Sequence, residues 1–265
     1  MTVGIFGDGA MAQAIKHLLL QNNICPVVFS RKLDNIANIT TVDIIFLCVP
    51  SKVVVEHTKI LQSVKSVVSC AKGIADSRQP FISSSFHMDQ FCVISGPNFT
   101  NEILANHGTI TTIASKNNDL LEQISQMLSS SSFEMEATND VVGVEICGII
   151  KNIIAIMMGY ASIKMPSWNE KSLILTKMFQ EIQVILKHFE CSPSIINLSC
   201  GIGDIFLTCS SVNSRNYRFG VNIAKGNNIT KDTIEGVRSL ALIDNIPVNT
   251  PYLQKVNLLL KEEVF

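Results

Sequence analysis

The sequence predicts an α/β fold whose N-terminal part holds a mostly parallel sheet and whose C-terminal part is all-α. Three observations carry this prediction. A β-rich run at residues 3–6 leads through a glycine turn into a helical pattern. Short apolar runs of strand length then alternate with helical patterns as far as residue 138, and helical patterns alone follow. We therefore expect two domains, spanning residues 1–138 and 139–265.

The composition is that of a compact globular protein. Of the 265 residues, 47% are hydrophobic and 16% are charged, and a formal net charge of -1 offers no electrostatic footprint for nucleic acid. Eight cysteines stand singly, without the paired spacing of a metal site, so no metal is expected. The N-terminus lacks the pattern of a signal peptide. Polar residues interrupt the longest apolar run, 141–161, so we expect no membrane span and a cytoplasmic location.

The first predicted strand, Val3–Phe6, runs into G-D-G-A-M-A at residues 7–12 and then a helix. This order is the context of a dinucleotide fingerprint and indicates a Rossmann-like domain. The first glycine allows a tight turn, the second lets a pyrophosphate approach the backbone, and the helix N-terminus faces the phosphates. By itself the motif is weak, because a loop can be glycine-rich by chance. The candidate cofactor contacts here are Gly7, Gly9, Ala10 and Met11.

The second predicted strand, residues 26–30, ends where a residue that reads the ribose is expected. An acidic residue there would indicate NAD, but Ser30 and Arg31 stand at this place. A hydroxyl and a guanidinium suit a 2′-phosphate, so NADP is the preferred cofactor and NAD the alternative. Arg31 could also be an ordinary solvated side chain that follows a strand.

A continuous apolar run at residues 43–49 predicts a strand of a parallel sheet that is covered on both faces. The connection before it, residues 31–42, is short for a crossover helix. A helix is expected over 53–61, and the next strand, 66–71, ends at Lys72. Open α/β sheets bind ligands at this edge, although a lysine there is as often simply solvated.

The last strands of the first domain are expected at residues 92–95, 109–114 and 133–137, with a helix at 119–128. Gly96-Pro97-Asn98 stops the first of them. Residues 138–140, T-N-D, predict the cap of the helix that opens the second domain.

That helix contains V-E-I-C-G-I-I-K-N at residues 144–152. A helix that is apolar all round is buried, so Glu145 and Lys151 are charges near an interior, where charge is costly unless paired or used. Small residues and one amide fall on a single face, which predicts a seam for another backbone: Gly148, Asn152, Ala155 and Gly159. A second long helix is expected over 171–188.

Two further clusters follow in the second domain. Asp204 stands among glycines and apolar residues, and S-R-N occupies 214–216. Asp204 either joins Lys151 or caps a helix after Gly203. Arg215 and its neighbours either bind a phosphate, which an arginine with a hydroxyl and an amide suits, or form a surface turn. Short helical segments and Glu235 complete the chain.

These motifs resemble those of the bacterial-type NAD(P)-dependent glycerol-3-phosphate dehydrogenases. They occur in the family's order: G-D-G-A-M-A-Q-A at residue 7, F-L-C-V-P-S at 46, A-K-G-I at 71, S-G-P-N-F at 95, V-E-I-C-G-I-I-K-N at 144, G-I-G-D-I at 201 and S-R-N at 214. The last three together are specific. The resemblance implies interconversion of dihydroxyacetone phosphate, a small phosphorylated three-carbon substrate, and sn-glycerol 3-phosphate, which would supply phospholipid synthesis. It also suggests a homodimer.

The resemblance further implies a role for each site residue. Lys151 would donate a proton to the substrate carbonyl oxygen as hydride arrives, with Lys72 and Asp204 as the other catalytic residues. The implied substrate contacts are Lys72, Gly96, Asn98, Lys151, Asn152, Asp204, Ser214, Arg215 and Asn216, of which the last three would hold the phosphate. The implied cofactor contacts are Gly7, Gly9, Ala10, Met11, Ser30, Arg31, Lys72, Thr100, Arg215 and Glu235. Glu145 keeps a structural role.

The chain also departs from the family, and rival functions stay open. It is shorter after Arg31 and in a loop near 166–170, where W-N-E replaces G-D-N; Asn98 and Thr100 are also unusual. A pyrroline-5-carboxylate reductase, or less closely a ketopantoate-type reductase, fits the N-terminal motif but not the second half. A non-catalytic dinucleotide sensor fits the shortened loops but not the retained set of Lys72, Lys151, Asp204 and Arg215.

Overall fold

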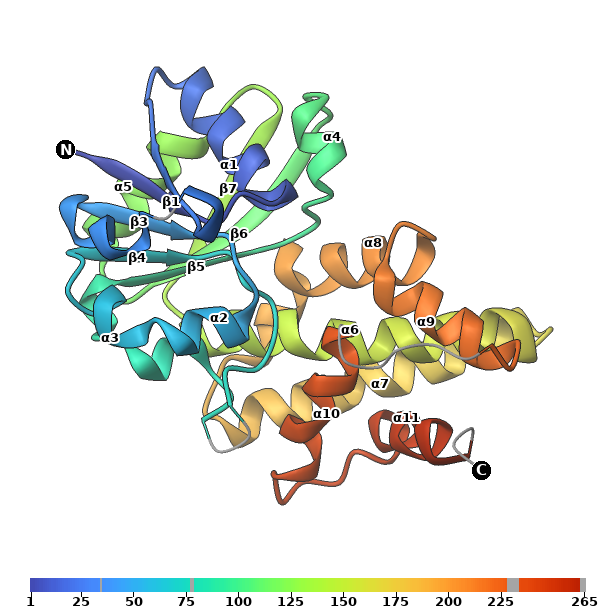
Figure 1. Ribbon diagram of the computed structural model, residues 1–265. Helices are drawn as coiled ribbons and strands as arrows, with labels where there is room; N and C mark the ends of the chain where they lie inside the picture. Colours follow the sequence, from blue (N-terminus) through green and yellow to red (C-terminus); the bar gives the residue numbers. More distant parts are fainter. Residues whose placement is uncertain (34, 77–78, 228–233, 263–265) are drawn as a thin grey trace. The chain divides into compact units, whose positions relative to one another are not determined.

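The computed structural model describes residues 1–33, 35–76, 79–227 and 234–262. The chain forms two compact units, Met1–Glu145 and Ile146–Phe265. Strands and helices alternate in the first unit, and the second is helical, which confirms the predicted fold class (Figure 1). The division lies inside helix α6 (Val141–Lys164), later than the boundary expected after residue 138.

A seven-stranded sheet of order β2-β1-β3-β4-β5-β6-β7 forms the first unit. Neighbouring strands run parallel except β5 and β6, which are antiparallel. The central strands β1 and β3 are buried at every residue, as a sheet covered on both faces requires. The strands are β1 (Val3–Phe6), β2 (Val27–Phe29), β3 (Ile44–Leu47), β4 (Ser66–Ser69), β5 (Phe91–Ser95), β6 (Thr109–Ser115) and β7 (Phe133–Thr138).

The helices of the first unit are α1 (Ala10–Gln21), α2 (Ser51–Glu56), α3 (Thr58–Leu61), α4 (Thr100–Leu104) and α5 (Asn118–Leu128). The single helix expected over 53–61 is wrong, because the chain breaks at His57, whose Nδ1 lies 2.9 Å from the Val53 carbonyl oxygen. Bonds from side chains to backbone compete with the helical ladder. The short connection between β2 and β3 holds two 3₁₀ helices in place of a crossover α-helix.

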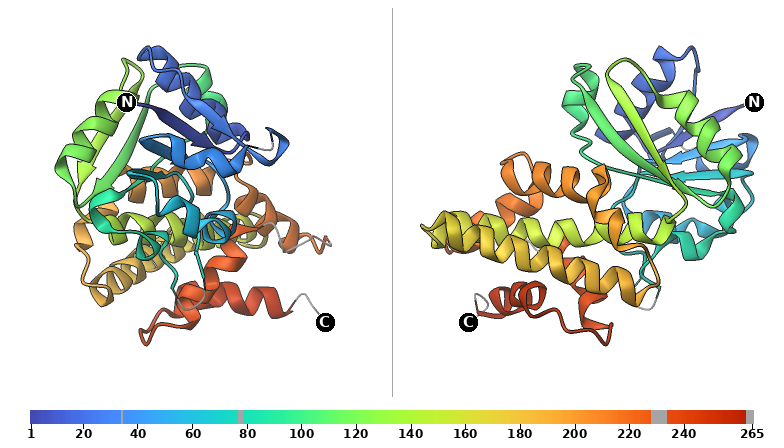
Figure 2. Two further views of the ribbon diagram at one scale, coloured as in Figure 1. Left: turned by 60° about the vertical axis from the view of Figure 1, so that its left-hand side comes forward. Right: turned by 180° about the vertical axis from the view of Figure 1, so that it is seen from behind.

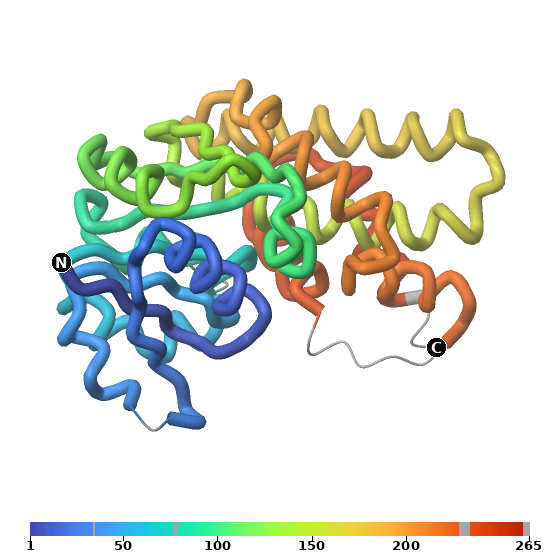
Figure 3. The backbone as a smooth tube through the Cα atoms, turned by 90° about the horizontal axis from the view of Figure 1, so that it is seen from above, coloured from blue at the N-terminus to red at the C-terminus, as the bar shows by residue number. Residues whose placement is uncertain are grey.

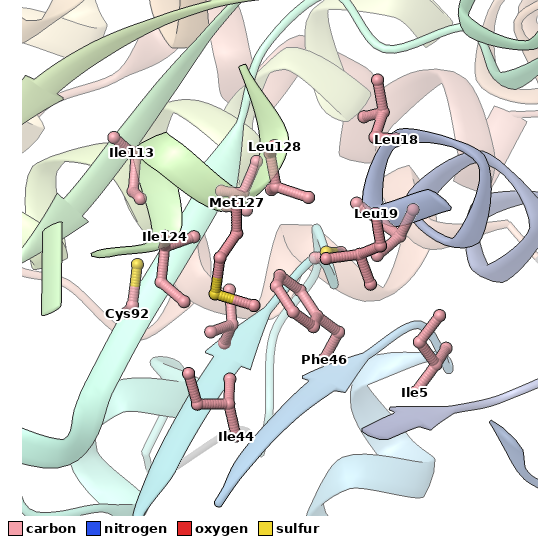
Figure 4. Close-up of a cluster of buried hydrophobic side chains, with 14 of the residues drawn as sticks. Ile5, Leu18, Leu19, Ile44, Phe46, Cys92, Ile113, Ile124, Met127 and Leu128 are labelled. Carbon is pink, nitrogen blue, oxygen red and sulfur yellow. The ribbon is translucent and has the colours of Figure 1, made fainter. Parts of the chain in front are cut away.

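Helices α1 and α5 pack on one face of the sheet. In Figure 4, Leu18 and Leu19 of α1 and Met127 and Leu128 of α5 lie around Phe46 of β3. None of these five side chains is more than 4% exposed. Burying one such side chain contributes about 1.5–3 kcal/mol. This core holds the N-terminus of α1 directly behind the glycine turn that follows β1.

The second unit begins within α6 and contains α7 (Trp168–His188), α8 (Asp204–Ser210), α9 (Arg215–Ala224), α10 (Glu235–Asp244) and α11 (Pro251–Glu262). Its two long helices, α6 and α7, are yellow-green and yellow in Figures 2 and 3. A π-helical turn, Ser199–Gly203, leads into α8.

Helix α7 begins earlier than expected. The Ser167 side chain caps it by accepting a hydrogen bond from the Glu170 amide at 3.3 Å. Serine followed three residues later by glutamate is a capping box. The W-N-E stretch is therefore the first turn of a helix, and the expectation of a loop there is wrong.

Glycines on two helices let α6 and α9 pack with their backbones in contact. A Cβ on Gly220 would collide with the Ile156 carbonyl oxygen, and one on Gly159 with the Tyr217 carbonyl oxygen. So close an approach needs residues that lack a side chain. Gly236 of α10 approaches the backbone of α6 in the same way. Of the seam predicted along α6, close backbone approach is confirmed at Gly159 and at Asn152.

Helix α6 is long and apolar enough to cross a membrane, with a mean hydropathy of 2.0 over its most apolar window. The expectation that its polar residues interrupt it too strongly is therefore wrong. In the part of the chain that the structure describes, 89% of that window is buried. A buried helix that is apolar all round is a core helix, and its burial, not its composition, marks α6 as one.

Candidate active site

A cavity of about 260 Å³ lies at the carboxyl ends of β1, β2 and β3. Four residues expected to contact a nucleotide line it: Gly7, Gly9, Ser30 and Arg31. This is the edge at which open α/β sheets bind ligands. The other six expected cofactor contacts do not line this cavity: Ala10, Met11, Lys72, Thr100, Arg215 and Glu235.

The cavity suits the phosphates and ribose of a dinucleotide. Gly7 has φ +122°, and a Cβ there would lie 2.7 Å from the Cys48 carbonyl oxygen. A Cβ on Gly9 would meet no described atom within 4 Å, so the backbone is open on that side. Ser30 is 5% exposed, and its Oγ has no hydrogen-bond partner among the described residues. An unsatisfied buried polar group costs about 1–3 kcal/mol, which a ligand bonded to it would offset.

Lys72, Gly96 and Asn98 come together at the carboxyl ends of β4 and β5. These strands are parallel neighbours, so residues that follow them share one edge of the sheet. Lys72 Nζ donates a hydrogen bond to the Gly96 carbonyl oxygen at 2.5 Å. Asn98 Nδ2 donates to Thr111 Oγ1 at 3.1 Å, while its Oδ1 is buried with no partner in the described ranges. Both a cation and an amide oxygen are thus held at this edge.

The centre of the second unit is a buried ion pair. Lys151 Nζ of α6 lies 2.6 Å from Asp204 Oδ1, the carboxylate that begins α8. Lys151 is 6% exposed and Asp204 1% exposed. Two charges so deeply buried are tolerated only with a close partner and further hydrogen bonds. Asp204 stands in the first turn of α8, and its bond to Lys151 favours the pairing over the capping alternative.

Thr208 forms hydrogen bonds to both members of the ion pair, and the sequence analysis did not predict this. Its Oγ1 lies 3.4 Å from Lys151 Nζ and donates to Asp204 Oδ1 at 3.3 Å. The signal that could have identified it is its spacing, since a residue one helical turn after Asp204 shares its face. The three side chains form one hydrogen-bonded group.

A second group joins three helices through amides. Asn216 Nδ2 of α9 donates to Asn152 Oδ1 of α6 at 2.8 Å. The Gly236 amide of α10 donates to Asn216 Oδ1 at 3.0 Å, and Asn152 Nδ2 donates to the Gly148 carbonyl oxygen at 3.1 Å. Asn152 directly follows Lys151, so this network also fixes the helix that carries the lysine.

Ser214, Arg215 and Glu235 lie at the starts of two helices. Ser214 Oγ caps α9 by accepting a hydrogen bond from the Tyr217 amide at 3.2 Å. Arg215 is exposed and begins α9, and Asn216 after it is buried, so these residues form the first turn of a helix and not an irregular surface turn. Burial raises the pKa of the Glu235 carboxyl, an effect that the charges of Arg238 and Arg215 oppose. Its Oε2 is buried without a hydrogen-bond partner among described atoms.

Glu145 belongs to the first unit and is buried. Its carboxylate accepts hydrogen bonds from the Ser83 amide and hydroxyl at 3.2 and 2.5 Å. Burial raises its pKa to about 7. The Glu145 side chain thus holds the segment at Ser83 against the start of α6. Within the described ranges, no group of three His, Cys, Asp or Glu side chains is placed to hold a metal ion.

Two family models match this chain. One describes the N-terminus of NAD-dependent glycerol-3-phosphate dehydrogenase and matches residues 11–121, and the other describes its C-terminus and matches residues 140–264. Together they contain the Lys72 group, the Lys151 pair and the Asn152 network.

Curated relatives carry the name glycerol-3-phosphate dehydrogenase (NAD(P)+). That of Psychrobacter arcticus is 35% identical over 218 residues, which are 77% of this chain and 50% of the relative. That of Pseudomonas putida is 30% identical over 245 residues, or 86% of this chain and 70% of the relative. The chain spans about half the length of the first of these relatives.

Solved structures show the same fold. The glycerol-3-phosphate dehydrogenase of Coxiella burnetii matches with a TM-score of 0.85 and 22% identity over 99% of this chain and 95% of that one. A ketopantoate reductase from Ralstonia eutropha is more distant, with a TM-score of 0.59 and 12% identity over 100% of both chains. At these identities the likeness concerns the fold alone.

Proposed function

This chain belongs to the NAD-dependent glycerol-3-phosphate dehydrogenase family, and from that premise we propose that it interconverts dihydroxyacetone phosphate and sn-glycerol 3-phosphate by hydride transfer. The observation that carries the proposal is the buried ion pair of Lys151 and Asp204, 2.6 Å apart. A lysine at such depth needs a reason beyond packing, and proton transfer to a ketone oxygen is one.

The chemistry follows from the charge that ketone reduction creates. The carbonyl oxygen becomes negative, and a nearby ammonium stabilises this charge and can neutralise it. The nicotinamide supplies the hydride when bound. Lys151 Nζ would give its proton to the carbonyl oxygen and take one back in the reverse direction. Asp204 stabilises the ammonium and, with Thr208, holds Nζ in one position.

Substrate recognition is divided by chemistry. Arg215, exposed at the start of α9, suits a phosphate dianion, together with Ser214 and Asn216. Lys72 and Asn98 would contact the same substrate near its hydroxyl and carbonyl groups. The buried Asn98 Oδ1, which has no partner in the described chain, can accept a hydrogen bond from a substrate hydroxyl.

NADP is the proposed cofactor, with NAD as the alternative. Ser30 and Arg31 line the cavity beside Gly7 and Gly9. A hydroxyl donor and a guanidinium match the 2′-phosphate that distinguishes NADP. Ala10 and Met11 would contact the phosphates from the first turn of α1, and Thr100, Lys72, Arg215 and Glu235 are the further proposed contacts.

A cytoplasmic location and a homodimer complete the proposal. No disulfide joins any of the eight cysteines, all of which lie in described parts of the chain. Disulfides are rare in a reducing compartment. Two-fold dimers are the commonest assembly of soluble proteins, and sedimentation would test this part. The product of the proposed reduction, sn-glycerol 3-phosphate, would supply phospholipid synthesis.

The test follows NADPH and NADH absorbance with purified protein and three substrates: dihydroxyacetone phosphate, pyrroline-5-carboxylate and ketopantoate. Oxidation with the first, and sn-glycerol 3-phosphate among the products, is expected. Oxidation with either of the others alone would replace this function by the corresponding reductase. Cofactor binding without oxidation of any substrate would make the protein a dinucleotide sensor.

A further inference from the structure

An apolar cavity of about 420 Å³ lies within the second unit, walled by α6, α7, α8 and α9. Met158, Leu175, Phe179 and Ile205 form its apolar lining. Cavities that bind small molecules hold roughly 300–1,000 Å³ and are mostly apolar with a few polar groups. None of the proposed substrate or cofactor contacts lines this cavity.

Large apolar side chains are exposed around its mouth. Trp168 is 79% exposed, Phe206 74% and Ile202 53%, and all three line the cavity. Single exposed apolar residues are ordinary, but a group of them around one hollow marks a binding surface. The cavity therefore has both an apolar interior and an apolar entrance.

The charge of the cavity selects one class of ligand. Among its described lining residues, Lys171 is the only charged one, and its Nζ lies 4.3 Å from the centre of the Trp168 ring. The neutral polar groups of the lining are the hydroxyls of Ser162, Ser210 and Tyr217 and the thiol of Cys209. A complementary ligand carries a long apolar portion and one negative charge.

Helix α8 connects this cavity to the ion pair. Ile205, Phe206 and Cys209 line the cavity. Asp204 and Thr208, on the same helix, bond to Lys151. A ligand that presses on one face of α8 acts on the carboxylate and hydroxyl that hold the lysine from the other.

We propose that this cavity binds a single-chain amphipathic anion of the fatty-acid type, with its chain between α6, α7 and α8 and its carboxylate at Lys171. Binding shifts α8 and thereby lowers the reactivity of Lys151. The first statement stands on the cavity alone, and the second rests on the proposed function.

Intrinsic fluorescence measures binding directly, because Trp168 is the only tryptophan of the chain. The full-length protein, without cofactor or substrate, is titrated with decanoate, 1-decanol and decylammonium below their micellar concentrations. Decanoate should produce a saturable change in emission and bind more tightly than the alcohol, with decylammonium weakest. Equal responses to all three, or no saturable response, would overturn the proposal.

Three variants locate the ligand. Lys171→Met removes the charge and should weaken decanoate binding about tenfold while leaving 1-decanol unchanged. Ser162→Met fills the cavity and should weaken both. Lys177→Met, which changes another lysine of α7 outside the lining, is the matched control and should alter neither. If Lys171→Met and Lys177→Met behave alike, the carboxylate is not held at Lys171 and the proposal fails.

Two further measurements separate the possible failures. Saturating decanoate should lower the rate of dihydroxyacetone phosphate reduction at least about fivefold in the wild type but not in Ser162→Met. If decanoate binds the wild type but leaves its rate unchanged, the proposed effect of the ligand on Lys151 through α8 is refuted. An inactive protein that still binds decanoate would refute the proposed function alone. A last outcome concerns a second copy of the chain. If the wild type is a dimer that does not bind decanoate, and Phe206→Glu converts it to monomers, a second copy covers this surface and the ligand proposal is overturned.

Discussion

At the residue scale, the proposed catalytic group consists of Lys151, Asp204 and Thr208, which are joined by hydrogen bonds. Asp204 and Thr208 lie one turn apart on α8 and both reach Lys151 Nζ. Removing one member of a buried pair leaves an uncompensated charge, at a cost of about 3–5 kcal/mol. Variants that keep the charges are therefore more informative than deletions.

Thr208→Val keeps the side-chain volume but removes the hydroxyl that bonds to Asp204 and Lys151. We expect kcat for dihydroxyacetone phosphate reduction to fall roughly tenfold, with little change in KM, because only the position of the ammonium is affected. Thr208→Ser keeps the hydroxyl and should recover most of the rate. Steady-state kinetics of the two variants decide this, and equal rates would show that the hydroxyl has no positioning role.

Arg31→Ala tests cofactor choice. The variant should raise the KM for NADPH roughly tenfold or more and leave that for NADH nearly unchanged, since only NADPH carries the 2′-phosphate. Lys52→Ala, on α2 outside the cavity lining, is the control for a general loss of positive charge. Equal losses of NADPH and NADH affinity in Arg31→Ala would contradict the preference for NADP.

Glu145 makes stability depend on pH in a defined window. Its pKa rises from 4.5 to about 7 through burial, so the folded protein keeps the proton longer than the unfolded chain. Its favourable contribution is complete below pH 4.5 and is lost as pH rises through 7. Relative to Glu145→Gln, the free energy of unfolding of the wild type should fall by about 2–3 kcal/mol between pH 5 and pH 8. Denaturant unfolding of both proteins measures it, and a difference that does not vary with pH would contradict a buried, titrating Glu145.

The sequence led to Lys151 because charge in an apolar helix needs an explanation. Residue types alone could not show that Asp204 is its partner, since the two are far apart along the chain and a helix cap was an alternative role for Asp204. Thr208 was missed because its one signal, a spacing of one helical turn from Asp204, gains meaning only when Asp204 is known to face Lys151. The roles of Asn152 and Asn216 as partners of each other likewise required three dimensions.

At the scale of elements, packing of α6 against α9 depends on Gly159 and Gly220. Gly220→Ala would place a Cβ against the Ile156 carbonyl oxygen. We expect the free energy of unfolding to drop by about 1–3 kcal/mol or more, as overpacking does. Gly108→Ala, whose Cβ would meet no described atom within 4 Å, is the control and should lie within about 0.5 kcal/mol of wild type. Thermal unfolding of the two variants measures this difference. If both lose similar stability, the backbones of α6 and α9 do not pack as closely as the structure indicates.

The pattern of apolar residues predicted the type of most elements correctly, because strands buried on both faces, such as β3, are continuous apolar runs and helices show a period of 3.6. It failed where a single side chain decided the outcome. His57 divides one expected helix into α2 and α3, and the capping box at Ser167 extends α7 backwards through W-N-E. Both depend on hydrogen bonds of polar residues, to which hydrophobic periodicity is insensitive.

At the scale of the whole molecule, the chain belongs to the family and spans about half the length of one curated relative. The connection between β2 and β3 holds 3₁₀ helices where a parallel sheet usually has a crossover α-helix. Yet both family models match, and the residues proposed for catalysis remain in their motifs. The short connection thus occurs together with intact motifs at the edge of the sheet and on α6 and α8, which carry the residues proposed for catalysis.

The central claim is that Lys151 is the acid in reduction of dihydroxyacetone phosphate, and Lys151→Arg tests it most directly. Arginine keeps the positive charge beside Asp204 but does not release its proton at neutral pH. The measurement is turnover of dihydroxyacetone phosphate alongside NADPH affinity from cofactor fluorescence. We predict an NADPH affinity close to wild type and a turnover rate lower by about 10²–10⁴-fold. A variant that retains most of the wild-type rate would contradict the account.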